Sequence, residues 1–134
     1  MKIFRSGDRP TRRGPDTYFT GHVTQDPIIE DPDRARAVSV TFAPGARTFW
    51  HTHPRGQTIH IVSGVGRAQV AGGPVVEMRA GDTIAFMPGE KHWHGAAPDH
   101  AMTHIAIHEA KDGVTVEWLE AVADSDYTAS PAKG

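Results

Sequence analysis

A group of side chains that can bind a metal surrounds one predicted turn. The segment WHTHPRGQTIH, residues 50–60, contains three histidines and a glutamine. Successive side chains of a strand point to opposite faces, so His51 and His53 share a face. Residues 54–56, Pro-Arg-Gly, supply a turn, and Gln57 begins the returning strand, from which it can face the pair. Two imidazoles and a carbonyl oxygen suit a borderline divalent metal, with a further ligand from a distant strand.

Two later segments also place a pair of histidines on one strand face, two residues apart in the first and four residues apart in the second. KHWHG places His92 and His94 on one face of a strand, and AMTHIAIHEA does the same for His104 and His108. The remaining histidines are interpreted as ordinary surface or hydrogen-bonded residues: His22, His60 and His100.

The segments that carry these histidines have the pattern of short strands. RTFWHTH, QTIHIVSG, GRAQVAGG, PVVEMRAGD, TIAFMPG, KHWHGAAP and AMTHIAIHEA are separated by Gly, Pro or Asp, which is typical of an all-β sandwich or barrel. Within ARAVSVTFAPG, Val38, Val40 and Phe42 share a face that would form an apolar, substrate-binding wall. Leu119 and Val122 lie at helical spacing, which predicts a strand end followed by a short C-terminal helix.

The length and composition limit the class of protein. We expect the 134 residues to form a single domain, 1–134, with a polar N-terminal arm over 1–17. No cysteine is present, which excludes disulfides and Cys-ligated zinc and fits a reducing cytoplasm. The net charge of −2 and the lack of a long apolar run predict no nucleic-acid partner and no membrane partner. Arg47 and Arg55 are long enough to reach a cavity mouth, but we expect them to be solvated.

The spacing of residues 45–64 resembles the first motif of the cupins: Gly, five residues, His-X-His, three residues, an acid, six residues, Gly. Only the acid differs, because Gln57 stands in its place. Residues 81–96 resemble the second motif, with Met87 for its proline and Ala96 for its asparagine. The resemblance implies a small antiparallel jelly-roll barrel. The metal ligands that it implies inside this barrel are His51, His53, Gln57 and His92.

A closer resemblance extends over most of the chain. TFAPGARTFWHTHPRGQTIHIVSG, GDTIAFMPGEKHWHGAAP and AMTHIAIHE are similar to the bacterial cupin hydroxynitrile lyases, which bind manganese through three histidines and a glutamine. The resemblance implies a Mn²⁺-dependent enzyme that interconverts an α-hydroxynitrile with an aldehyde or ketone plus HCN, and a homodimer or homotetramer. It makes His104 the candidate general base, because a neutral histidine works as a base near pH 7. The further candidate catalytic residues are His94 and His108.

Gln57 also bears on the reactivity of such a site. A neutral amide and three neutral imidazoles leave the ion its full 2+ charge, which favours Lewis-acid chemistry. By ligand chemistry alone, Fe²⁺, Ni²⁺, Co²⁺ or Zn²⁺ could replace Mn²⁺. The same ligands would also serve a metal-dependent cupin dioxygenase acting on a small aromatic or diketone, and a non-catalytic cupin that binds a small molecule is a further alternative. Cleavage of mandelonitrile without O₂ would separate the lyase from the dioxygenase.

Overall fold

The computed structural model describes residues 1–132, which form twelve strands and one short helix. All pairings between the named strands are antiparallel. The elements are β1 (Arg12–Arg13), β2 (Phe19–Thr20), β3 (Val23–Ile29), β4 (Arg36–Phe42), β5 (Arg47–Thr48), β6 (His51–Thr52), β7 (Gln57–Val70), β8 (Val76–Arg79), β9 (Thr83–Phe86), β10 (His92–Ala96), β11 (Met102–His108), β12 (Glu117–Trp118) and α1 (Asp124–Tyr127).

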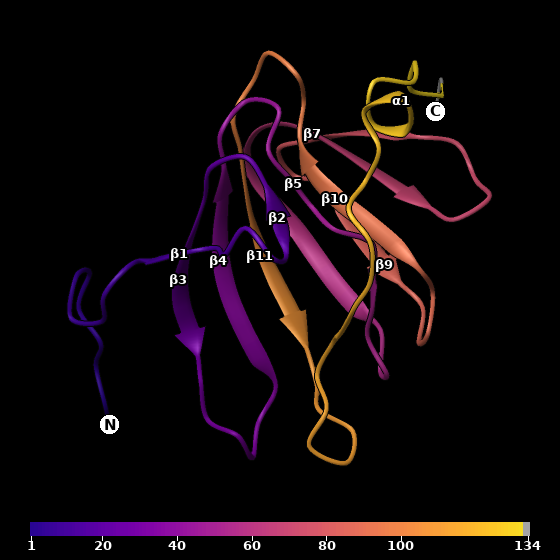
Figure 1. Ribbon diagram of the computed structural model, residues 1–134. Coiled ribbons are helices and arrows are strands. Elements are labelled where there is room, and N and C mark those ends of the chain that lie inside the picture. Colours follow the sequence, from indigo (N-terminus) through magenta and orange to yellow (C-terminus); the bar gives the residue numbers. More distant parts are fainter. Residues whose placement is uncertain (133–134) are drawn as a thin grey trace.

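The long strand β7 belongs to two sheets and joins them into a curled, half-open barrel (Figure 1). Its first half pairs with β11 and β9, in the sheet that continues through β4 and β3 to β1. Its second half pairs with β10 and β8, in the sheet that also contains β2, β5, β6 and β12. The prediction of an all-β jelly-roll fold is therefore confirmed.

Gly64 lies where β7 passes from one sheet to the other. Its φ is +82°, a conformation that side chains with a Cβ rarely adopt. A Cβ at this position would also lie 1.9 Å from the carbonyl oxygen of Ala101. The last glycine of the first motif is thus needed both for its backbone conformation and for the close approach of the neighbouring chain.

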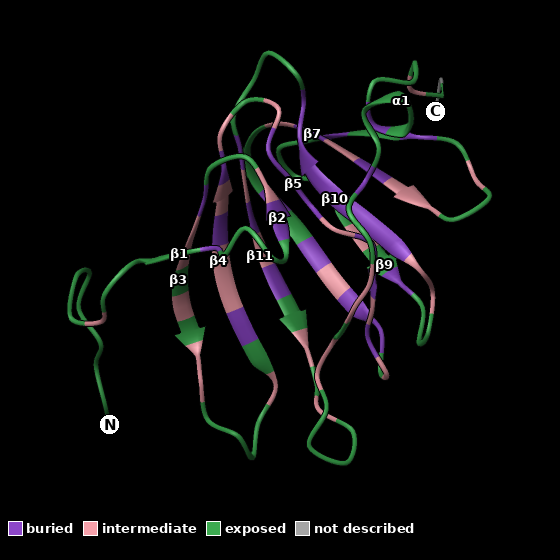
Figure 2. Cartoon of the chain, viewed as in Figure 1, coloured by how far each residue is buried: buried purple, intermediate pink, exposed green. Residues whose placement is uncertain are grey.

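Apolar side chains pack in two clusters on opposite sides of the second sheet. Figure 2 shows that β10, which lies in this sheet, is buried along its length. The inner cluster lies between the sheets and includes Phe42, Ile59 and Ile61. The outer cluster forms where the C-terminal segment crosses the back of β10 and covers Trp93 with Tyr127. The C-terminal segment thus replaces solvent on a face that would otherwise be exposed.

The C-terminal segment also changes the environment of Arg47. We expected this side chain to be solvated, but Arg47 is only 6% exposed. It donates to the carbonyl of Val122 at 2.9 Å and to Asp124 at 2.7 Å, and its guanidinium lies over the ring of Tyr127. The expectation was wrong because strand parity places Arg47 outside the barrel but does not show that the tail covers that face.

Short elements lie at both ends of the chain. A strand end, β12, precedes the short C-terminal helix α1, as predicted. The helix is formed by other residues than expected, because Leu119 and Val122 lie before it, outside any helix or strand. At the other end, residues 1–11 run along the outside, mostly exposed, and β1 then pairs with β3. Within the described residues, no helix is long and apolar enough to span a bilayer.

Candidate metal centre and active site

Three buried histidines converge inside the barrel from two neighbouring strands. His51 opens β6 and lies directly opposite His92, the first residue of β10. His53 follows β6 and precedes the turn, where its carbonyl accepts hydrogen bonds from the backbone of Gly56 and Gly89. One ring nitrogen from each histidine can be chosen so that the three atoms lie within 4.8 Å of one another. This group of His51, His53 and His92 could therefore hold a metal ion.

Each of the three rings is fixed by a hydrogen bond on its far side. The Nδ1 atoms of His51, His53 and His92 lie 2.8, 2.7 and 2.8 Å from backbone carbonyl oxygens. The acceptors are the carbonyls of Phe49, Thr115 and Glu90. A carbonyl oxygen can only accept, so each Nδ1 carries the hydrogen and each Nε2 keeps its lone pair. This anchoring by backbone carbonyls is characteristic of histidines that ligate metals.

Burial keeps these rings neutral. Desolvation is the largest cause in each case: it lowers the pKa of His51 well below its ordinary value, lowers that of His53, and lowers that of His92 to about 4. For His51 the neighbouring His92 lowers the pKa further. Neutral imidazoles are the form that binds a cation, so the rings need not lose a proton at pH 7 before they can coordinate a metal.

Gln57, the first residue of β7, adds an oxygen to this group. Its Oε1 lies 3.2 Å from His92 Nε2, and both atoms present lone pairs because His92 carries its hydrogen on Nδ1. Two such acceptors repel each other unless a cation lies between them. The Nε2 of His53 is also buried without a hydrogen-bond partner among the described residues. These donors fit a divalent first-row metal, which binds imidazole and carbonyl groups.

A second chain of hydrogen bonds runs from Gln57 to His104. His94 Nε2 lies 3.2 Å from Gln57 Oε1, and His94 Nδ1 lies 2.9 Å from His104 Nε2. Because the amide oxygen only accepts, His94 donates from Nε2 and accepts at Nδ1 in its neutral form. His104 must then donate from Nε2, which leaves a lone pair on its Nδ1. That atom is buried and has no hydrogen-bond partner within residues 1–132.

Burial also keeps the second group of histidines neutral. It is the main cause that lowers the pKa of His94 well below its ordinary value, with the nearby His104 as the next cause. It lowers the pKa of His104 to about 4. The pKa of His108 is also lowered to about 4, by burial and then by the neighbouring His53, on which its ring packs with 4.8 Å between centroids.

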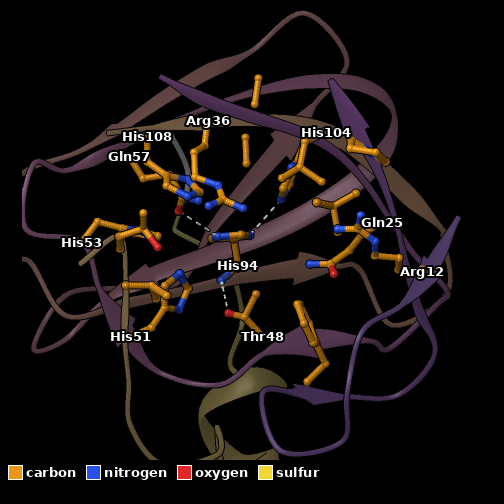
Figure 3. Close-up of a pocket in the computed structure, with 18 of the residues that line it drawn as sticks. Arg12, Gln25, Arg36, Thr48, His51, His53, Gln57, His94, His104 and His108 are labelled. Carbon is orange, nitrogen blue, oxygen red and sulfur yellow. Dashed lines mark hydrogen bonds between the residues drawn. The ribbon is translucent and has the colours of Figure 1, made fainter. Parts of the chain in front are cut away.

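A cavity of about 260 Å³ opens between the two sheets and reaches these side chains (Figure 3). The predicted apolar wall lies in it, since Val38, Val40 and Phe42 all line the cavity. Of the predicted metal ligands, His51, His53 and Gln57 line it, whereas His92 does not. The predicted catalytic residues His94, His104 and His108 line it as well. The structure therefore places all of the predicted site residues except His92 around one cavity, and His92 contacts the cavity-lining Gln57.

Three contributors to the site were missed in the sequence. Thr48 is buried in the cavity wall, and its hydroxyl oxygen accepts from the backbone N–H of His94 at 3.2 Å, which leaves its own O–H free to donate. Trp118 packs on the ring of His51, with 4.7 Å between centroids. Thr115 supplies a carbonyl to His53. Two of these come from the C-terminal segment, which carries no motif that would have connected it to the histidines.

The sequence was compared with known protein families and with characterised proteins. Residues 38–108 match the family model described as a cupin domain. The chain belongs to the cupin family. Over 129 residues it is 54% identical to a protein named (R)-mandelonitrile lyase from Granulicella tundricola, with 95% of this chain and 98% of that protein covered.

Solved structures agree with this assignment. A cupin-like protein from Thermotoga maritima is 36% identical, with a TM-score of 0.84 over 90% of this chain and 94% of that chain. The polyketide cyclase from Streptomyces resistomycificus superposes with a TM-score of 0.75 at 18% identity, over 95% of this chain and 90% of that chain. At that identity the likeness concerns the fold alone.

Proposed function

We propose that this protein is a metal-dependent hydroxynitrile lyase, which interconverts a cyanohydrin with an aldehyde or ketone plus HCN. The observation that carries the proposal is the unpaired Nδ1 of His104, buried beside a partly apolar cavity that His51, His53 and Gln57 also line. The similarity to the (R)-mandelonitrile lyase of Granulicella tundricola over nearly the whole chain supports the same activity.

His104 would act as the general base. Its Nδ1 takes the proton of the cyanohydrin hydroxyl while the bond between the carbinol carbon and the nitrile carbon breaks. The electron pair of that bond leaves with cyanide, and the proton then passes from His104 to cyanide, which leaves as HCN. The step needs no further reactant, because the single proton that His104 removes ends on cyanide and the charges balance. In this proposal His94 is a positioning residue, because both of its ring nitrogens are engaged by Gln57 and His104.

The metal would be held by His51, His53, Gln57 and His92, and we propose Mn²⁺ as the ion. When bound, a dication with neutral ligands supplies electrostatic stabilisation to the negative charge that develops as the carbon–carbon bond breaks. Because imidazole and amide groups also bind Fe²⁺, Co²⁺, Ni²⁺ and Zn²⁺, the choice of Mn²⁺ rests on the resemblance to the manganese lyases.

The cavity walls would hold the remainder of the substrate. Val38, Val40 and Phe42 form an apolar face suited to an aryl or alkyl group, and they exclude water from the base. The Thr48 hydroxyl donates toward the reacting oxygen or the nitrile. A small cavity of about 260 Å³ favours substrates of roughly one ring.

We further propose that the protein forms a homodimer or homotetramer and that it is located in the cytoplasm. Val62 and Ile107 support an association through the outer face of the first sheet, because they are 50% and 42% exposed on the adjacent strands β7 and β11. Measurement of the molar mass in solution by light scattering tests the oligomeric state.

An anaerobic cyanide-release assay with racemic mandelonitrile tests the activity. Chelator-treated protein reloaded with Mn²⁺ should release cyanide and benzaldehyde in equal amounts without O₂. His104→Ala should lower kcat by roughly 10²- to 10⁴-fold, the usual contribution of a general base. His60→Ala, which replaces an exposed histidine on β7, is the matched control and should retain full activity. Absence of turnover in the fully loaded protein would refute the proposal.

A further inference from the structure

The open end of the cavity carries a guanidinium group without a carboxylate partner. Arg12, Glu30 and Arg36 are the charged residues, histidines aside, that line the cavity. Arg12 and Glu30 pair with each other at 2.9 Å. Arg36 makes no ion pair with any carboxylate in the described part of the chain. Its charge is therefore left for another partner.

The register of the sheet directs Arg36 into the cavity. Arg36 begins β4, and the side chains that share its face are Val38, Val40 and Phe42, in order from the open end inward. Its partner across the sheet is His108, on β11. Figure 3 shows the side chains of both residues together at one edge of the cavity. The inner face of β4 thus changes from cationic to apolar toward the base.

The charge balance of the cavity favours an anion. One carboxylate, Glu30, faces two guanidinium groups, so the lining carries a net charge of +1. Burial lowers the pKa of each histidine that lines it, so these rings are uncharged near pH 7. A dication held by the proposed metal ligands would increase the positive charge further. A concave, partly apolar wall strengthens the attraction for an anion within it. Guanidinium groups bind carboxylates through paired, charge-assisted hydrogen bonds.

We infer that the natural ligand of this cavity carries a carboxylate, bound by Arg36, at the end opposite its reacting carbon. Combined with the proposed function, on which the identity of the reacting group rests, this makes the substrate class a carboxylate-bearing cyanohydrin and its parent aldehyde or ketone. His104 lies opposite Val40, four residues from Arg36 along β4. These backbone positions are about 13 Å apart, and both side chains lean into the cavity, so a ring-sized body can reach both.

Binding of two aldehydes that differ only in charge tests the inference. Benzaldehyde and 4-formylbenzoate are titrated separately into the metal-loaded protein without cyanide, and dissociation constants are measured by ligand-observed NMR. The wild-type protein should bind 4-formylbenzoate about tenfold more tightly, the order expected for one charge-assisted contact. The preference should shrink at high salt.

Substitutions assign this preference to a residue. Arg36→Gln should abolish it and leave benzaldehyde binding unchanged, whereas Arg36→Lys should keep part of it. Arg34→Gln is the matched control, because Arg34 is exposed in the preceding turn and lies outside the cavity lining. Equal binding of both aldehydes by the wild-type protein overturns the inference, as does a preference that survives Arg36→Gln or disappears in Arg12→Gln alone.

The two proposals fail in different ways in these experiments. The binding titration contains no cyanide and requires no turnover. A protein that prefers the carboxylate but cleaves no cyanohydrin would retain the inference about Arg36 and lose the lyase. A protein that cleaves mandelonitrile but binds both aldehydes equally would retain the lyase and lose the carboxylate site.

Discussion

Acidification should unfold the metal-free protein because several histidines are buried in neutral form. His92 and His104 are fully buried, and the pKa of each is lowered from 6.5 to about 4 by desolvation. Between about pH 4 and pH 6.5 the unfolded chain binds protons at these histidines that the folded chain does not. The free energy of unfolding therefore falls as the pH falls. Above about pH 7 both states are neutral at these positions and the penalty disappears.

The magnitude follows from the two shifts. One pKa unit corresponds to about 1.4 kcal/mol, so at pH 5 each of these histidines costs about 2 kcal/mol and the two together about 4 kcal/mol. His51 and His94, whose pKa values are also lowered by burial, add to this loss. Because a small domain is stable by only about 5–15 kcal/mol, the metal-free protein should approach unfolding at pH 5.

Urea denaturation of the chelator-treated protein at pH 7, 6 and 5 measures this effect. The expected result is a loss of at least about 4 kcal/mol in the free energy of unfolding, with an unchanged m-value. His104→Leu removes one of the titrating groups, so its stability should depend less steeply on pH, whatever its stability at pH 7. A wild-type stability that stays constant between pH 7 and pH 5 would show that these rings are not buried as described.

Two substitutions test other parts of the account. Gln57→Glu places a carboxylate beside three imidazoles, so calorimetry should detect tighter binding of Mn²⁺. The anaerobic kcat for mandelonitrile should fall, because the added negative charge makes the metal a weaker Lewis acid. Weaker metal binding would argue against Gln57 as a ligand. Arg47→Ala removes the bonds to the C-terminal segment and should lower the free energy of unfolding by about 2 kcal/mol; an unchanged melting temperature would show that this segment is not held by Arg47.

Strand parity explains why the sequence could place several of the candidate residues on a common side of the sheet. The spacing His-X-His requires a shared face for His51 and His53, and the turn that follows limits where Gln57 can point. The ring that completes the group, His92, is 35 residues from Gln57 along the chain. Its position was predicted from motif spacing, because parity gives the face of a strand and not the neighbour of that strand.

The parts that could not be predicted depend on contacts between distant segments. The segment that includes Thr115 and Trp118 has no periodicity that indicates where it packs, yet it holds His53 by a hydrogen bond and covers His51. The burial of Arg47 depends on the same segment. Similarly, the tautomer of His104 follows only from the hydrogen-bond chain through His94, which needs atomic positions rather than residue types.

The central claim, that His51, His53, Gln57 and His92 hold one divalent ion, is tested most directly by titrating Mn²⁺ into chelator-treated protein and following the free ion by electron paramagnetic resonance. We predict one tightly bound ion per chain, lost in His92→Ala and retained in His60→Ala. If the wild-type protein binds no ion, or if His92→Ala binds Mn²⁺ as well as the wild-type protein, the metal centre described above does not exist.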